Sequence, residues 1–136
     1  MKTKLLHVAL IFLVFNYIEA NQKFEINSKQ INEMLKTDTL YVIGVDEKYE
    51  NKIKNFQSIG KGYLEYKSRK LNFDDYSKDT NFVIFAKKDK ISIRFLEELK
   101  AFGFKKLKYL KNGDKSWIEV LINFRGIKLF SMFNSL

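Results

Sequence analysis

Apolar residues follow two different spacings along this chain. Two runs, 40–45 and 82–85, are almost continuously apolar, which is typical of strands buried on both faces of a sheet. From Ile91 to Phe102, apolar residues instead recur at the spacing of one helix face. Gly103 follows, at the place where a helix C-terminus favours a left-handed residue. The pattern therefore predicts two buried strands and a helix after the second.

Capping and turn residues indicate further elements on both sides of this centre. A short stretch, 24–26, predicts a strand, and Asn27 can cap a following helix with Gln30 three residues later. Near the other end of the chain, 106–110 alternates between basic and apolar residues like a half-buried strand. The turn 112–114 then leads into a last amphipathic helix.

The polar segment after the first apolar run has a weaker pattern. Its Tyr49 and Ile53 lie at helical spacing, so we interpret the segment as a helix. Strands that alternate with helices predict an α/β fold, with a central, mostly parallel sheet of about five strands and helices on both faces. Ligands of such folds bind outside the carboxyl ends of the strands, where the loop 86–91 lies.

The start of the chain has the order of a secretory signal. Lys2 and Lys4 precede an apolar run, 5–15, and the small residue Ala20 ends the segment. That run is shorter than the roughly 20 apolar residues of a membrane-spanning helix. We therefore predict a cleaved signal peptide over 1–20, export to a bacterial periplasm, and no stable membrane span. An uncleaved anchor and a buried N-terminal helix are the alternatives.

Composition removes several kinds of chemistry. The chain has no cysteine, and its one histidine, His7, lies in the predicted signal. The exported chain then has no thiolate, no imidazole base and none of the usual ligands of zinc, copper or iron–sulfur clusters. We expect no metal and no other cofactor.

The net charge of +9 favours anionic ligands, but it does not by itself indicate a specific one. The lysines of 105–111 alternate with apolar residues, and solvent-facing strand positions explain them. An exported protein also meets little nucleic acid, to which basic charge alone gives only non-specific attraction. Nucleic acid is therefore not an expected partner.

Two motifs give the chain a family resemblance. The stretch VIFAKKDKISIRFLEELKAFGF contains a buried strand, a basic loop, a serine and a helix, and KKLKYLKNGDKSW contains a strand, a turn and a tryptophan. In this order and spacing they resemble the rhodanese-like (sulfurtransferase) domain, over 26–120. The resemblance implies a rhodanese-like domain at 21–122, between the signal at 1–20 and an apolar C-terminal extension at 123–136.

The residues that transfer sulfur in that family are replaced here. In the family, a cysteine at the head of the loop takes a sulfane sulfur as a persulfide and passes it on, and the matching residue is Ala86. A methyl group cannot do this, because the step depends on a thiolate. The other replacements are Gly44 and Asp46 for an aspartate and an arginine, Lys52 for a histidine, Ile91 for an arginine and Asn112 for a glycine. Ser92 and Gly113 are retained.

The resemblance also implies where a ligand would bind. We predict a ligand-facing loop made of Ala86, Lys87, Lys88, Asp89, Lys90, Ile91 and Ser92. If the N–H groups of this loop converge above a helix N-terminus, it can hold a sulfur oxyanion, sulfate, phosphate or carboxylate. The simpler interpretation is that the lysines occupy solvent-exposed positions and that Asp89 cancels part of their charge.

Other prominent residues have simpler explanations than function. Trp117 lies at helical spacing with Val120, so we expect it in the core. Asp74 and Asp75 are adjacent, which makes them a poor acid–base pair, and they are better explained as the start of a helical turn. In the tail, apolar residues recur every third position over 121–133. There we favour packing against the domain over an exposed docking surface.

The sequence thus predicts a catalytically inactive rhodanese-like domain of the cell envelope, which binds a protein partner or a small oxyanion through the former active-site loop. The sequence leaves its oligomeric state open. The alternative is an enzyme of unrecognised chemistry that uses carboxylates, tyrosines or lysines in place of cysteine and histidine, such as a lysine of lowered pKa beside the loop.

Overall fold

The computed structural model describes residues 23–46, 53–60, 63–67 and 70–134, with side chains up to residue 124. The elements, in chain order, are β1 (Glu25–Ile26), α2 (Ser28–Met34), β2 (Leu40–Val45), β3 (Ile53–Gly60), β4 (Tyr63–Tyr66), the 3-10 helix η1 (Phe73–Asp75), β5 (Phe82–Ala86), α3 (Asp89–Ala101), β6 (Leu107–Leu110) and α4 (Gly113–Asn134). The predicted signal peptide at 1–20 lies outside the described residues.

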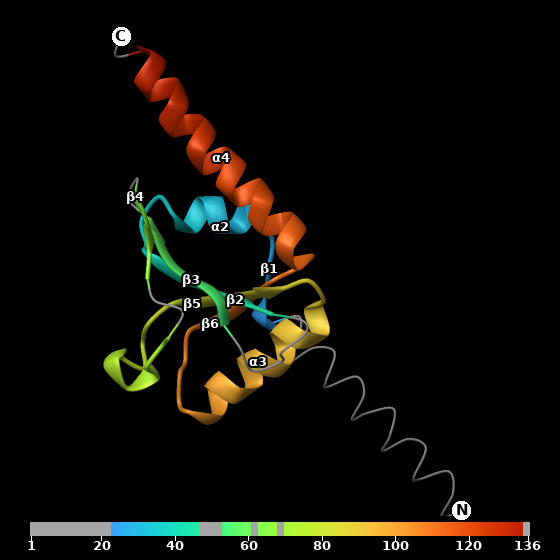
Figure 1. The fold of residues 1–136 in the computed structure, drawn as a ribbon. Helices are drawn as coiled ribbons and strands as arrows, with labels where there is room; N and C mark the ends of the chain where they lie inside the picture. The colour runs from blue at the N-terminus through green and yellow to red at the C-terminus, as the bar shows by residue number, and fades with distance from the viewer. Residues whose placement is uncertain (1–22, 47–52, 61–62, 68–69, 135–136) are drawn as a thin grey trace, which may run out of the picture.

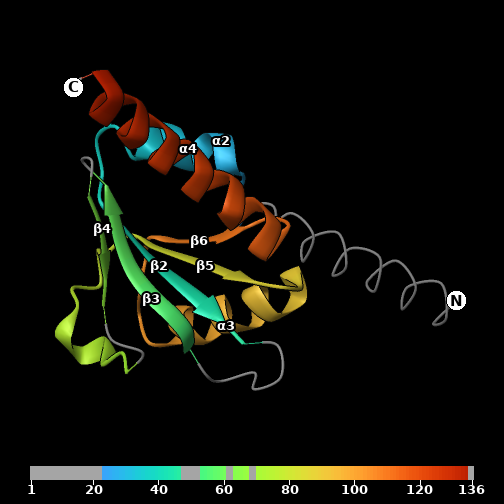
Figure 2. The ribbon, with the colours of Figure 1, turned by 45° about the horizontal axis from the view of Figure 1, so that its top comes forward.

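A six-stranded sheet forms the centre of the fold (Figure 1, Figure 2). Its order is β1-β6-β5-β2-β3-β4, in which β1, β6, β5 and β2 run parallel to one another, β3 is antiparallel to β2, and β4 is antiparallel to β3. The predicted α/β class is confirmed. The expectation of a mostly parallel sheet is wrong, because the sheet is mixed; it has six strands where about five were expected.

The difference arises in the segment after β2. Ile53, which we predicted to lie in a helix, begins β3, and Tyr49 lies outside the described residues. Phe56 and Ile59 of β3 are buried, and Phe56 pairs with Ile43 of β2. These contacts between distant parts of the chain decide the strand, because strand formation depends on packing against neighbours more than on local preference.

Helix α3 lies on one face of the sheet, and α2 and the first turns of α4 lie on the other (Figure 1). The face under α3 buries Ile91, Phe95 and Leu99 together with Ile84 of β5. The opposite face buries Ile31 from α2, Trp117 and Val120 from α4, and Val83 and Phe85 from β5. Strand β5 contributes to both clusters because successive side chains of a strand point to opposite faces.

The predicted capped helix after the first strand is confirmed as α2. The Gln30 N–H donates to Asn27 Oδ1 at 2.8 Å, and the Asn27 N–H donates to Gln30 Oε1 at 2.9 Å. This reciprocal pair satisfies two N–H groups at the helix start. The Ser28 hydroxyl also donates to Glu119 of α4 at 3.0 Å, which joins the two helices on this face.

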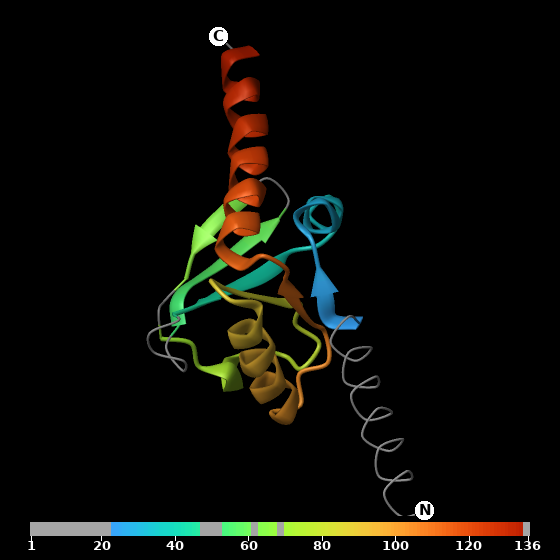
Figure 3. The ribbon, with the colours of Figure 1, turned by 90° about the vertical axis from the view of Figure 1, so that its right-hand side faces the viewer.

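Helix α4 runs without interruption across the predicted boundary between residues 122 and 123. Its C-terminal part projects beyond the sheet (Figure 3). Leu121 and Phe124 are partly buried against the core, whereas the side chains of the apolar repeat after Phe124 lie outside the described residues. Packing of that repeat therefore stays a prediction. Within the described ranges, no helix combines the length and the apolar character required to cross a membrane.

Candidate functional site

Ala86 lies at the junction of a strand, a short loop and a helix. It is the last residue of β5, pairs with Val45 of β2, and has a fully buried side chain. Only Lys87 and Lys88 separate it from α3, which begins at Asp89. The junction therefore lies at the carboxyl end of a parallel strand, where ligands of α/β folds bind.

Most of the predicted loop belongs to the first turn of α3. The N–H groups of Ile91 and Ser92 donate to the Lys88 carbonyl at 3.1 and 3.4 Å, so these two donors are engaged within the turn. The side chains of both residues are buried, and the Ser92 hydroxyl has no hydrogen-bond partner among the described residues. Lys87, Lys88 and Lys90 are exposed, and Asp89 is half-buried.

The turn before α4 packs directly onto this junction. Asn112 and Gly113 both have positive φ angles, of 63° and 42°. A Cβ atom at Gly113 would lie 1.5 Å from the Ala86 carbonyl oxygen, so a side chain has no room there. The Asn112 N–H donates to Asp89 Oδ1 at 3.1 Å, which ties the same turn to the start of α3. Gly113 thus serves a close approach of two backbones.

The junction carries both signs of charge. Burial raises the pKa of the Asp89 carboxyl above its usual value, and nearby Glu25 adds to this, while the Asn112 N–H and Lys111 oppose it. Lys111 Nζ lies 3.8 Å from Glu25 Oε1. When ionised, the Asp89 carboxylate lies at the N-terminus of α3, where the helix dipole favours negative charge. A second anion at this helix end would be repelled by the Asp89 carboxylate.

Two of the other positions matched to the family lie in or directly after β2, the strand that pairs with β5. Gly44 lies within β2 opposite Phe85, and a Cβ there would lie 2.7 Å from both the Phe85 ring and Asn55 Oδ1. Close packing therefore explains this glycine. Asp46 follows β2, and Lys52 lies outside the described residues.

The simpler explanations of the remaining polar and aromatic residues are confirmed. Trp117 is buried and stacks on Phe85 with ring centroids 5.3 Å apart, so it belongs to the core. Asp74 and Asp75 are exposed and lie in η1, immediately before Tyr76. In the part of the chain that the structure describes, no group of three or more carboxylate, histidine or cysteine residues is placed to hold a metal ion.

Comparison of the chain with protein-family models, curated proteins and solved structures gives no match. The rhodanese-like resemblance accordingly depends on the strand–loop–helix and strand–turn–tryptophan motifs of its sequence.

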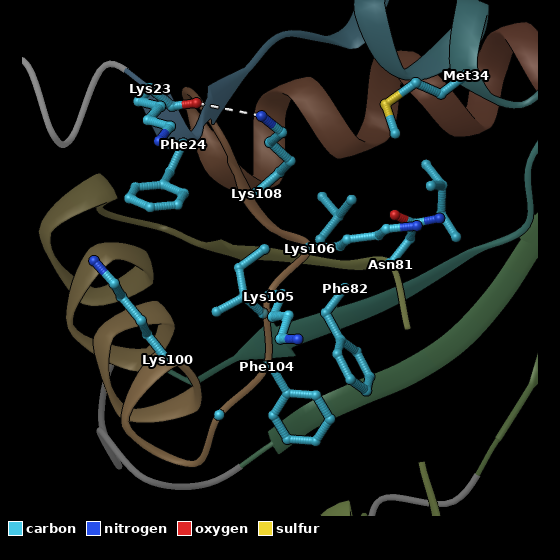
Figure 4. A pocket seen from close by; sticks show the side chains of 14 residues that line it. Lys23, Phe24, Met34, Asn81, Phe82, Lys100, Phe104, Lys105, Lys106 and Lys108 are labelled. Carbon is cyan, nitrogen blue, oxygen red and sulfur yellow. Dashed lines mark hydrogen bonds between the residues drawn. The ribbon is translucent and has the colours of Figure 1, made fainter. Parts of the chain in front are cut away.

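A second feature, at the opposite end of the sheet, was not predicted from the sequence. A cavity of about 590 Å³ lies at the amino ends of β5 and β6 (Figure 4). Five lysines line it, namely Lys23, Lys100, Lys105, Lys106 and Lys108. The last three were explained as solvent-facing strand positions, and only the fold brings Lys23 and Lys100 beside them.

Proposed function

We propose that the chain is a catalytically inactive rhodanese-like domain of the cell envelope that binds an anionic partner at the β5–α3 junction. The observation that carries the proposal is the identity and burial of Ala86, which ends β5 at the position matched to the sulfur-carrying cysteine. Sulfur transfer requires a thiolate that attacks a sulfane sulfur, and an alanine methyl can neither attack nor carry it.

The exposed lysines around the junction support binding of negative charge. Lys87 and Lys88 precede α3, and Lys90 lies in its first turn. The loop has two residues, and the N–H groups of Ile91 and Ser92 are engaged in the helix. Such a surface can attract an acidic protein segment from outside, whereas a small oxyanion would need several convergent N–H donors. An acidic protein partner is therefore favoured over an enclosed oxyanion.

Binding can be tested by calorimetric titration with poly-L-glutamate, and with sulfate and thiosulfate as small-oxyanion probes. We expect the double variant Lys87→Gln/Lys90→Gln to weaken poly-L-glutamate binding roughly twofold to thirtyfold, since each exposed charge contributes about 0.2–1 kcal/mol. The matched control, Lys29→Gln/Lys54→Gln, removes the same charge from exposed positions in α2 and β3. An equal loss in both variants would show general charge attraction and defeat the proposal.

Inactivity is tested by a thiosulfate–cyanide assay on the purified protein. The proposal predicts no thiocyanate above a protein-free blank, and turnover above that blank would defeat it. Export is a separate part of the proposal. Mass spectrometry of the protein recovered from the envelope fraction should give a chain that begins at Asn21, and an intact N-terminus would contradict cleavage.

A further inference from the structure

Strand β4 is an outer strand of the sheet, and among the described strands it pairs with β3 alone (Figure 2). An outer strand presents a row of N–H and C=O groups to which another strand can pair, and natural proteins often block it with proline or with charges. The chain contains no proline, and two tyrosines of β4, Tyr63 and Tyr66, are 77% and 58% exposed. The outer side of β4 is therefore a surface to which a further strand can be added.

The hydrogen bonds to β3 show which backbone groups of β4 point outward. The Lys67 N–H donates to the Phe56 carbonyl at 2.8 Å, one position beyond the registered pair of Gln57 and Tyr66. Hydrogen-bonded and non-hydrogen-bonded pairs alternate along an antiparallel ladder. The N–H and C=O groups of Tyr66 and Leu64 therefore point away from β3, to the side on which no described strand lies.

The charges beside Tyr66 match a second copy of the same strand. Glu65 and Lys67 flank Tyr66, and Lys67 Nζ lies 3.1 Å from Glu65 Oε2. In an antiparallel pair of two β4 strands centred on Tyr66, Glu65 of each copy lies opposite Lys67 of the other. A pair centred on Glu65 would instead place two carboxylates opposite each other, which is destabilising. Charge therefore favours the register centred on Tyr66.

We propose that two copies of the chain associate through β4, antiparallel and centred on Tyr66, so that their two sheets become one continuous sheet. The Tyr66 N–H of each copy donates to the Tyr66 carbonyl of the other. Two pairs of Glu65 with Lys67 form on one face, and the two Tyr66 rings lie opposite each other on the other face, where aromatic pairs add stability. The surface is separate from the β5–α3 junction, because β2 and β3 lie between β5 and β4.

A second copy fits this edge better than an acidic or a basic peptide. An acidic segment would place carboxylates opposite Glu65, and a basic segment would approach a chain whose net charge is +9. Two copies also repel each other through their net charge, but salt screens this repulsion beyond about 8 Å at physiological ionic strength, and the facing pairs are closer than that. Because few residues meet, we expect a dissociation constant between about 10 μM and about 1 mM.

The association can be measured by sedimentation velocity on the full chain, expressed so that its own N-terminal processing takes place. Between about 10 μM and about 1 mM, the protein should change from monomer to dimer. Tyr66→Pro should weaken the dimer by about 5-fold to 150-fold, the range expected for two lost hydrogen bonds. This proline leaves the bonds to β3 intact, because the Tyr66 N–H points outward. Tyr66→Phe keeps the ring and both donors, and it should change the affinity less than about twofold.

Charge reversal tests the register. Glu65→Lys places lysine opposite lysine at two positions and should weaken the dimer at least about fourfold. Glu65→Lys/Lys67→Glu restores both pairs with the signs exchanged, and its affinity should return to within about twofold of the original. Glu33→Lys is the matched control, because Glu33 has the same side-chain exposure as Glu65 and also lies 3.1 Å from a lysine. It adds the same charge away from β4 and should change the affinity less than about twofold.

Disulfide formation tests the register a second way, because the chain has no cysteine of its own. When Glu65→Cys and Lys67→Cys proteins are mixed and oxidised, the main product should be a disulfide between the two different variants. Their Cα atoms lie about 4.5 Å apart in the proposed pair, within the usual range of about 4.4–6.8 Å. In either variant alone, the two Cα atoms would lie about 8 Å apart, which is too far. Intact mass distinguishes these products.

Three results would overturn the inference. The first is a monomer at every concentration. The second is a dimer that Tyr66→Pro leaves unchanged while its circular dichroism and tryptophan fluorescence stay native, because another surface would then hold the two copies. The third is an equal loss of affinity in Glu65→Lys and Glu65→Lys/Lys67→Glu, a comparison that remains decisive if Tyr66→Pro does not fold. A disulfide formed mainly between two Glu65→Cys chains would contradict the register.

Discussion

Gly113 at the start of α4 tests the packing of the β5–α3 junction most sharply. A methyl group at this position would lie 1.5 Å from the Ala86 carbonyl oxygen and 2.7 Å from its carbonyl carbon. Neither atom can move aside as the end of a flexible side chain can, because β5 is paired with a strand on each side. We therefore expect Gly113→Ala to displace the start of α4 from the sheet.

Two contributions set the magnitude of this effect. Gly113 has a φ of +42°, and a left-handed backbone costs a residue with a side chain about 1–2 kcal/mol. Overpacking against surroundings that cannot relax costs about 1–3 kcal/mol more. Gly113→Ala should therefore lower the free energy of unfolding by about 2–5 kcal/mol. The total free energy of unfolding of a domain is usually about 5–15 kcal/mol.

Urea unfolding followed by circular dichroism measures the loss, and tryptophan fluorescence locates it. Trp117 is the only tryptophan of the chain and stacks on Phe85 at 5.3 Å, so displacement of α4 should change its native emission. Gly103→Ala is the matched control. Gly103 has a φ of +98°, but its nearest neighbours are side-chain atoms of Lys78 at 3.8 Å, so only backbone strain is expected. A Gly113→Ala variant that loses no more stability than Gly103→Ala and keeps its native emission would refute the reasoning.

Two other substitutions address the same junction. Burial raises the pKa of Asp89, so the folded protein binds this proton more tightly than the unfolded chain, and stability falls as pH rises from the usual carboxyl pKa of 3.8 through the folded value. When the free energy of unfolding is measured at several pH values, the Asp89→Asn variant should not show this fall. An equal pH dependence of the unfolding free energy in the wild-type protein and the variant would contradict the prediction. Ser92→Ala should leave the free energy of unfolding unchanged or raise it by up to about 1 kcal/mol, because the buried Ser92 hydroxyl has no hydrogen-bond partner among the described residues. A loss above about 1 kcal/mol would contradict this.

The parts of the fold that the sequence predicted are those in which local signals and burial agree. The apolar runs that became β2 and β5 are buried, and the residues at helical spacing in α3 face the core. The turn before α4 was also predicted, because asparagine and glycine are the residues that tolerate the positive φ angles that this turn requires. Strand β3 was missed because its stability comes from pairing with β2 and β4, which no local spacing reveals.

The sequence placed the loop correctly between β5 and α3, but it predicted a longer loop than the structure has. Ile91 was assigned both to the ligand-facing loop and to the apolar face of the following helix, and these two roles exclude each other. The structure buries Ile91 under the sheet, which leaves a loop of two residues before α3. The helical spacing of Ile91 with Phe95 was the signal that could have shortened the predicted loop. The basic cavity had no such signal, because its lysines come from separate segments.

The most direct test of the account measures whether sulfur can be loaded at position 86. The Ala86→Cys protein would be incubated with thiosulfate and its intact mass measured, with Lys87→Cys as an exposed-thiol control that an alkylating reagent must label. Because Ala86 is fully buried beneath Gly113, we expect no added sulfur and no thiocyanate on addition of cyanide. A persulfide on Ala86→Cys that cyanide removes as thiocyanate would contradict it.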